Sequence, residues 1–332
     1  MINSSYRDLS WDILRGILIL LVVVGHSVQD LQLRTSYDSS LYATIYNAIY
    51  LFHMPLFVFV SGYFSYSMTK RTFNETMKIK VKRLVIPWLV WSSFVMLVSL
   101  QSLNCNFISI GQATYRIYAH YYWFLPCVFI LSLSYYSILN FKKKMKWKIL
   151  SVMILMIWVL SLIFNSRIPF NYLEYMQISR QAIPFGLGLL YFKYRNALKR
   201  STKTFIFSTA VLGMLLGFYH YGIWQNNYTI LEKISNGSMM TIVTFCVLNF
   251  FCNKVPDLSL VGKSLCWCGQ NSLGIYVVHM FLRIIYKRFQ IFNNSVNDFS
   301  FVFLAASYLG VSLIIILGVK MVFRQKSYVL GI

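Results

Sequence analysis

Long apolar runs recur from one end of the chain to the other, separated by short polar segments. Each run has roughly 17 to 22 residues, enough for a helix to cross about 30 Å of hydrocarbon. The pattern predicts an all-α polytopic bundle of about ten transmembrane helices. Their predicted spans are 11–28, 45–67, 84–103, 119–139, 148–164, 180–192, 204–221, 238–252, 270–288 and 301–322.

The sixth run differs from the others because it is short and carries Pro184, Gly186 and Gly188. If any of the ten predicted spans is broken, re-entrant or wrongly bounded, we expect it to be this one. The first run carries Arg15 and His26 and is followed by no small-residue cleavage site, so we interpret it as a retained helix rather than a signal peptide.

Composition supports lipid as the main solvent of this chain. Of its 332 residues, 58% are hydrophobic and 12% are charged, against a charged share of roughly 25% in soluble domains. The predicted loops are too short to form a separate soluble domain. We therefore expect residues 1–332 to form a single integral membrane domain, a multi-pass protein whose first partner is the lipid bilayer.

The net charge of +22 would suggest nucleic acid in a soluble protein. Here, most Lys and Arg residues fall in alternate loops, including 70–83, 142–148 and 193–203. Basic loops stay in the cytoplasm, so this asymmetry predicts that both termini lie inside, and nucleic acid is not needed as a partner.

Cysteine and histidine usage gives no sign of a metal site. The six cysteines lack Cys-x2-Cys spacing and lie mostly in or beside apolar runs, where cysteine behaves as a small hydrophobic residue. The histidines of the apolar runs have no acidic partner of the kind that metal sites usually include. We predict neither a metal nor a disulfide framework.

Ionisable residues at membrane depth carry the functional signal, because each is costly unless paired or hydrated. Arg15 and His26 are eleven residues apart in the first run, which is about three helical turns and about 16 Å along the axis. Both side chains should therefore share one face. Arg binds phosphate, while His exchanges protons near neutral pH. Alternatively, Arg15 pairs with Asp12 at the interface and His26 is a satisfied bundle histidine.

Three further histidines are predicted to lie toward the outer half of the bundle and could converge with His26. Each has a structural alternative: His53 could cap a helix that begins near Pro55, His120 could belong to an interfacial aromatic belt, and His279 could be a buried packing residue. On the inner side, Lys80, Lys82 and Arg83 precede Pro87 and could help Arg15 to bind a phosphorylated donor, although most loop charge only sets topology.

Several segments, taken in order, resemble the acyltransferase-3 family of membrane O-acyltransferases, and more closely its branch that resembles fucose O-acetylases. The resemblance spans nearly the whole chain. It rests on Arg7 to Asp12 with Arg15, Gly16 and His26; Phe52-His53-Met54-Pro55-Leu56-Phe57 with Ser61-Gly62; Lys82-Arg83-Leu84 with Pro87; Trp123-Phe124-Leu125; Pro184-Phe185-Gly186-Leu187-Gly188; and Asn271-Ser272-Leu273-Gly274-Ile275-Tyr276 with His279.

The resemblance implies a ten-helix bundle in the bacterial inner membrane, an acyl-coenzyme A donor that enters from the cytoplasm, and a glycan hydroxyl as acceptor. It gives Arg15 and His26 the essential roles. We predict an O-acetyltransferase that uses acetyl-coenzyme A and no metal. The expected catalytic residues are His26, His53 and His279; the donor-binding residues are Arg15, Lys82 and Arg83; and the acceptor-binding residues are Trp123, Tyr276 and His120.

Two other classes of protein fit the same pattern. A bundle of this kind could export a polysaccharide or lipid-linked precursor without acyl transfer, or it could serve as a scaffold in a glycan-synthesis complex. Transport should survive removal of coenzyme A, whereas acyl transfer should not. The sequence indicates neither the sugar nor the oligomeric state.

Overall fold

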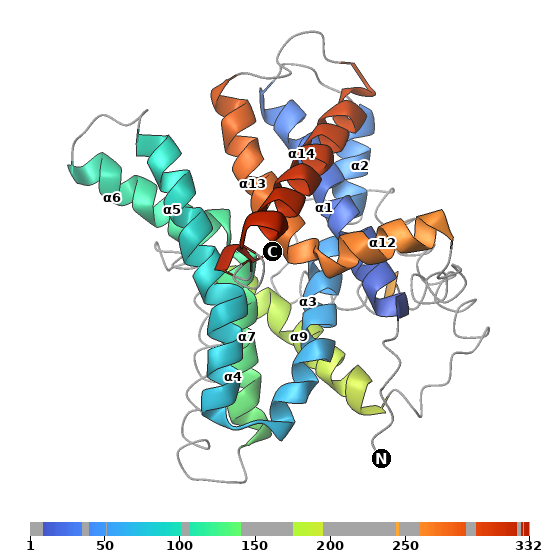
Figure 1. Cartoon of the computed structure of the whole chain (residues 1–332), viewed down its shortest axis with the longest axis vertical. Helices are drawn as coiled ribbons and strands as arrows, with labels where there is room; N and C mark the ends of the chain where they lie inside the picture. The colour runs from blue at the N-terminus through green and yellow to red at the C-terminus, as the bar shows by residue number, and fades with distance from the viewer. Residues whose placement is uncertain are drawn as a thin grey trace, which may run out of the picture.

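The computed structural model describes residues 9–34, 40–50, 52–100, 107–140, 175–194, 244–245, 259–289, 297–323, 327 and 329–331. Regular structure in these residues is entirely helical, as the sequence predicts (Figure 1). The predicted spans 148–164 and 204–221, and all of 238–252 except residues 244–245, lie outside the described residues.

The helices fall into a first group near the N-terminus and a second group near the C-terminus. The first comprises α1 (Leu9–Arg34), α2 (Ser40–Tyr50), α3 (His53–Ser65), η1 (Tyr66–Lys70), α4 (Phe73–Lys80), η2 (Val81–Val85), α5 (Ile86–Leu100), α6 (Phe107–Arg116), η3 (Ile117–Tyr121) and α7 (Phe124–Leu139). The second comprises α9 (Tyr175–Tyr194), α12 (Leu260–Gln270), α13 (Ser272–Arg288) and α14 (Ser300–Phe323).

Four helical segments of the described chain are long and apolar enough to cross a membrane: Leu9–Gln32, Ser40–Lys70, Phe73–Ser99 and Ser300–Phe323. They correspond to the first three predicted spans and the tenth, and they make this an integral membrane protein. The third begins eleven residues before the predicted residue 84, because α4 continues into α5 through the π-helical turn η2. A total of about ten helices and the cytoplasmic placement of both termini stay predictions.

Of the alternatives for the sixth span, the structure favours wrong bounds over a break, since α9 runs from Tyr175 to Tyr194 with Pro184 inside it, against the predicted 180–192. The neighbouring glycines instead allow close packing. A Cβ atom added to Gly188 would overlap the backbone of Phe59 in α3, and one added to Gly62 of α3 would overlap the backbone of Phe185. Small residues at these points let the two helices approach closely, which drives helix association in lipid.

Helices α1, α13 and α14 form one side of the bundle (Figure 1). Successive residues of α1 meet successive residues of α13, His26 with His279 and then Asp30 with Arg283, so the two helices run parallel. This agrees with their predicted places as the first and ninth spans. Helix α14 runs antiparallel to α13, because Tyr286 meets Ser307 at one end of the helix pair and Asn271 meets Lys320 at the other.

Helix α12 crosses the N-terminal part of α1 at close range. A Cβ atom on Gly16 would overlap the carbonyl group of Leu265, and one on Gly269 would overlap the carbonyl oxygen of Asp12. This crossing holds the start of α13 beside Arg15.

The α1–α12 crossing should not tolerate even a methyl group. We expect Gly269→Ala to destabilise the protein by about 1–3 kcal/mol, because the backbones cannot separate without disturbing both helices. Gly310→Ala is the matched control, since a Cβ atom there meets nothing within 4 Å. Unfolding of both variants in detergent micelles measures the difference. Equal stability of the two variants would contradict the close crossing.

Candidate active site

Two histidines from distant parts of the chain meet between α1 and α13. The Nδ1 atom of His26 lies 3.0 Å from the Nε2 atom of His279, and the two rings stack with centroids 5.2 Å apart. His279 is fully buried, whereas His26 keeps some exposed surface. The predicted convergence of His26 and His279 is therefore present in the structure.

Hydrogen bonding fixes which ring nitrogens carry protons. The Nδ1 atom of His279 lies 2.7 Å from the carbonyl oxygen of Ile275, which can only accept, so this nitrogen must donate. The Nε2 atom of neutral His279 then carries a lone pair and accepts a hydrogen bond from the N–H group at Nδ1 of His26. It follows that Nε2 of neutral His26 is unprotonated and can act as a base.

One helical turn beyond the histidines, a buried ion pair joins the same two helices. Arg283 donates from Nη2 to Oδ1 of Asp30 at 2.7 Å and from Nε to Oδ2 at 2.8 Å. Tyr308 of α14 donates to the same carboxylate at 2.8 Å, and Arg283 also donates to Gln29 at 3.0 Å. Two-pronged pairing of this kind fixes both distance and rotation. It holds α1 and α13 in the register that brings the histidines together.

The other two predicted histidines, His53 and His120, differ from His26 and His279 in their position. His53 is buried and donates from Nδ1 to the carbonyl oxygen of Ile49 at 2.7 Å. The ring centroid of Tyr50 lies 4.6 Å from that of His53 and 6.3 Å from that of His26. His53 therefore neighbours the pair through Tyr50 and is not a member of it. His120 makes its ring contact with Tyr115.

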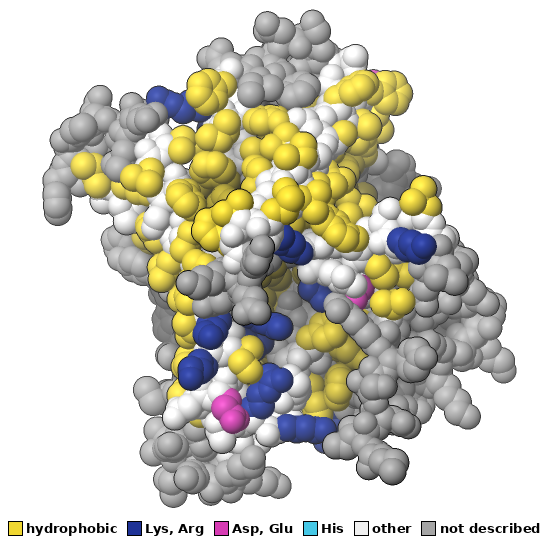
Figure 2. Space-filling model, in the orientation of Figure 1, with side chains coloured by type: hydrophobic (Ala, Val, Ile, Leu, Met, Phe, Trp, Pro, Cys, Tyr) yellow, Lys and Arg dark blue, Asp and Glu magenta, His cyan; other side chains and the backbone are white. Residues whose placement is uncertain are grey.

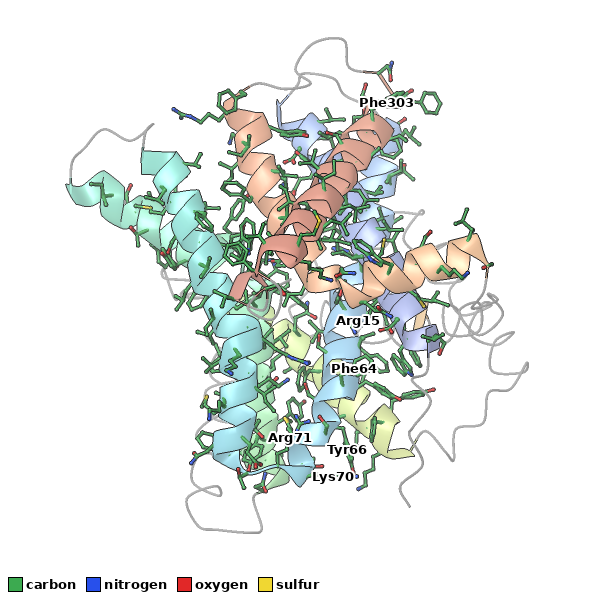
Figure 3. All side chains as sticks on the ribbon, viewed as in Figure 1. Arg15, Phe64, Tyr66, Lys70, Arg71 and Phe303 are labelled. Carbon is green, nitrogen blue, oxygen red and sulfur yellow. The ribbon has the colours of Figure 1, made fainter. Side chains whose placement is uncertain are left out.

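Arg15 lies on the same face of α1 as His26, as the helical spacing predicts. Its Nη2 atom donates to Oγ of Ser272, the first residue of α13, at 3.3 Å. Its Nη1 atom lies 3.5 Å from Asp12, and its guanidinium group lies over the ring of Phe64 at 5.5 Å. The pairing of Arg15 with Asp12 that the sequence allows is present, yet the arginine also borders a cavity (Figure 3).

This cavity, of about 890 Å³, opens among α1, α3, α4, η2, α7 and the α12–α13 junction. Its size suits an organic ligand. Among the described residues that line it there is no Asp or Glu, and five are basic: Arg15, Arg71, Lys80, Lys82 and Arg83. Figure 2 shows Lys and Arg side chains gathered around this part of the surface. A cavity with this lining will attract anions.

The cavity changes character toward its inner end. Val22, Phe57, Phe124 and Tyr276 line it there, and Val22 lies one helical turn before His26. Tyr276 is nearly buried, and its ring centroid lies 5.9 Å from that of His279. The cavity therefore leads from the basic residues toward the histidine pair and ends one turn short of it.

The predicted binding residues are divided between the cavity and the packed core. Arg15, Lys82 and Arg83 line one cavity, and Tyr276 lies at its inner end. Trp123 precedes α7 and packs edge-to-face on Phe124, outside the set of lining residues. Within the described residues, no group of three or more His, Cys, Asp and Glu side chains could hold a metal ion.

Sequence reasoning missed Arg71, Asp30 and Arg283. Arg71 follows the helical turn η1 and looked like one more cytoplasmic loop cation, yet it borders the cavity. Asp30 and Arg283 each lie four residues after a histidine of the pair. This repeated spacing was the available signal, although Asp30 lies two residues beyond residue 28, where the first predicted span ends.

The described residues thus combine four helical segments able to cross a membrane with a cationic cavity and a histidine pair near its inner end. This chain belongs to the acyltransferase-3 family, whose acyltransferase domain matches residues 8–321. No solved structure is significantly similar to it.

Two curated relatives are similar to part of the chain. The nodulation protein NolL of Mesorhizobium japonicum is 28% identical over 152 residues, which are 44% of this chain and 39% of that protein. NolL of Sinorhizobium fredii is 33% identical over 129 residues, or 38% of this chain and 35% of that protein. The match thus spans well under half the length of either relative.

Removing one partner of the buried ion pair should leave an uncompensated charge. We expect Arg283→Ala to lower the free energy of unfolding by about 3–5 kcal/mol. The double variant Asp30→Asn, Arg283→Gln keeps neutral hydrogen-bonding groups and should recover more than half of that loss. Thermal unfolding in micelles measures both. A double variant that is no more stable than Arg283→Ala would show that the charge pair does not hold these helices.

Proposed function

We propose that this protein is a membrane O-acetyltransferase that moves the acetyl group of acetyl-coenzyme A to a hydroxyl group of a cell-surface or lipid-linked glycan. The observation that carries the proposal is the placement of Arg15 and His26 on one face of α1, with a basic cavity at the first and a neutral histidine pair at the second. The description of the family as an acyltransferase domain supports the chemistry.

The phosphate groups of the donor bind among Arg15, Arg71, Lys82 and Arg83. Guanidinium groups form charge-assisted, two-pronged hydrogen bonds with phosphate, and lysine adds charge. Lys80 donates to Ser65 at 2.7 Å and contributes its charge from the cavity wall. The uncharged arm of coenzyme A then lies along the apolar inner end, past Phe57 and Phe124, with its thioester directed toward His26.

The proposed reaction uses His26 as a general base. Its Nε2 atom takes the proton of the acceptor hydroxyl while the hydroxyl oxygen attacks the thioester carbonyl carbon. The carbon–sulfur bond then breaks, coenzyme A leaves as a thiolate, and the new ester bond remains on the glycan. The thiolate regains a proton from Nε2 of His26, which returns the base to its neutral form.

His279 and His53 have supporting roles in this proposal. His279 accepts the hydrogen bond from Nδ1 of His26, which keeps the proton off Nε2 and stabilises the imidazolium group that forms during transfer. His53 supports Tyr50 beside the base. Tyr276 borders the path of the thioester.

The orientation and the membrane location predicted from the sequence fit the proposed reaction. A cytoplasmic basic end gives the cavity access to cytoplasmic coenzyme A. The similar proteins come from the bacteria Mesorhizobium japonicum and Sinorhizobium fredii, which supports a bacterial inner membrane as the location. Membership of the branch that resembles fucose O-acetylases remains part of the proposal.

Removal of the base tests the catalytic assignment. We expect His26→Asn to lower the rate of acetyl transfer by about 10²–10⁴-fold, while affinity for the donor stays within about twofold of the wild type. Purified protein in nanodiscs, labelled acetyl-coenzyme A and a panel of glycans provide the rate, and equilibrium binding of the labelled donor provides the affinity. Normal ester formation by His26→Asn would remove the assignment. Glycan transport without any ester in the wild type would favour an exporter.

Arg71 offers a matched test of the donor site, because the neighbouring Lys70 is exposed as Arg71 is but does not line the cavity (Figure 3). We expect Arg71→Gln to raise KM for acetyl-coenzyme A about tenfold, the effect of losing one charge-assisted hydrogen bond. Lys70→Gln should leave KM within about twofold of the wild type. Dephospho-coenzyme A as a competitor shows whether the lost contact involves the 3′-phosphate. Equal effects of both variants would indicate general surface charge instead of a binding site.

A further inference from the structure

The exposed part of His26 does not face the basic cavity. His26 is only partly buried, yet it is not among the residues that line that cavity. Tyr50 contacts the ring of His26, Tyr46 stacks on Tyr50, and Gln29 accepts from Tyr50. These three side chains keep some exposure, while Ile49, His53 and Asp30 are buried. The exposed surface of His26 therefore lies outside the basic cavity, and the space next to it is bordered by Tyr50 of α2 and Gln29 of α1.

Two tyrosines line this space as a stack. Tyr46 and Tyr50, one turn apart on α2, lie with ring centroids 4.0 Å apart and planes within 25°. The edge of Tyr50 points toward His26, with centroids 6.3 Å apart, and toward His53 at 4.6 Å. A continuous aromatic surface thus leads from the partly exposed Tyr46 to the base.

Gln29 adds a polar group whose orientation is determined. Arg283 can only donate, so the atom that it contacts at 3.0 Å is the amide oxygen of Gln29. The hydroxyl group of Tyr50 donates to the same oxygen at 3.4 Å. With this oxygen used by protein donors, the NH2 group of the partly exposed Gln29 side chain is the end that can donate to a ligand.

The charges that face this space cancel. Asp30 is paired with Arg283 through two hydrogen bonds, and its second oxygen also accepts from Tyr308. Among the described residues, the border therefore consists of aromatic faces, an amide group and hydroxyl groups without a net charge. A neutral pyranose ring has a matching surface, because one face carries C–H groups and the rim carries hydroxyl groups.

We infer that Tyr46, Tyr50 and Gln29 form the acceptor site, in which the C–H face of an uncharged sugar ring packs on Tyr46 and a ring hydroxyl reaches Nε2 of His26. This inference rests on the proposed function and gives it a substrate class, an uncharged sugar. Donor and acceptor approach the base from opposite sides, the donor through the basic cavity and the sugar along α2. Trp123 and His120, predicted as acceptor-binding residues, are not part of this surface.

Kinetics of Tyr46 variants test the site. Tyr46→Leu should raise KM for a neutral glycoside acceptor about three- to tenfold, the usual worth of an aromatic packing contact. Its kcat and its KM for acetyl-coenzyme A should stay within about twofold of the wild type. Tyr46→Phe keeps the ring and should restore the acceptor KM. Thr44→Ala, at an exposed position on the same helix, is the matched control.

Direct binding separates this inference from the proposed function. Saturation-transfer NMR of protein in nanodiscs with methyl glycosides of neutral and uronic sugars, without donor, should show contact with the neutral ones that Tyr46→Leu removes. If the wild type binds neutral glycosides in this way but forms no ester with any of them, the acceptor site stands and the proposed function fails. If ester forms while Tyr46→Leu leaves the acceptor KM unchanged, the function stands and this site is overturned. Preference for uronic sugars also overturns it.

Discussion

The register between α1 and α13 is the constraint on which the rest of the structure depends. Two contacts set it, His26 with His279 and Asp30 with Arg283, and both repeat at a spacing of four residues along parallel helices. In lipid, neither pair can be replaced by water, so sliding or rotating one helix would strand a charge as well as a polar ring. The same register also brings Ser272, at the start of α13, to Arg15. One packing arrangement therefore positions His26, the proposed base, and Arg15, the proposed phosphate-binding group, together.

The donor cavity depends on a second feature, the helical connection between the second and third membrane-crossing segments. A Thr72 capping box starts α4, and the π turn η2 carries Lys82 and Arg83 before α5 begins. A π turn rotates the following residues relative to a regular helix, and such turns are often found at functional sites. Cations that composition assigns to a cytoplasmic loop thus become part of the wall of a cavity that also borders α1 and α13.

Helical periodicity was enough to predict that Arg15 and His26 share a face, because both lie in one uninterrupted helix of regular geometry. The pairing of His26 with His279 was only one of several open convergences, since nothing in a single sequence orders helices that are 253 residues apart. Arg71 was assigned to a loop by its charge alone, whereas Arg283 lies within the predicted ninth span but had no predicted partner. Burial of Arg283 depends on Asp30 from another helix, and local sequence does not contain that information. The sixth span was drawn too short rather than broken, and the glycines beside Pro184 serve contact with α3.

The choice of a neutral partner for the base follows from the charges around it. A carboxylate in the place of His279 would hold an imidazolium group more strongly, but burying a second carboxylate beside Asp30 in a low-dielectric bundle is costly without another cation. Among the described residues, the carboxylate beside this histidine pair is that of Asp30, and Arg283 already neutralises it. His279 instead supplies a lone pair without a charge, so the site is neutral until a proton is transferred. In the proposed reaction, the donor then brings its negative charge only to the basic residues at the far end of the cavity, and the acceptor side stays suited to an uncharged sugar.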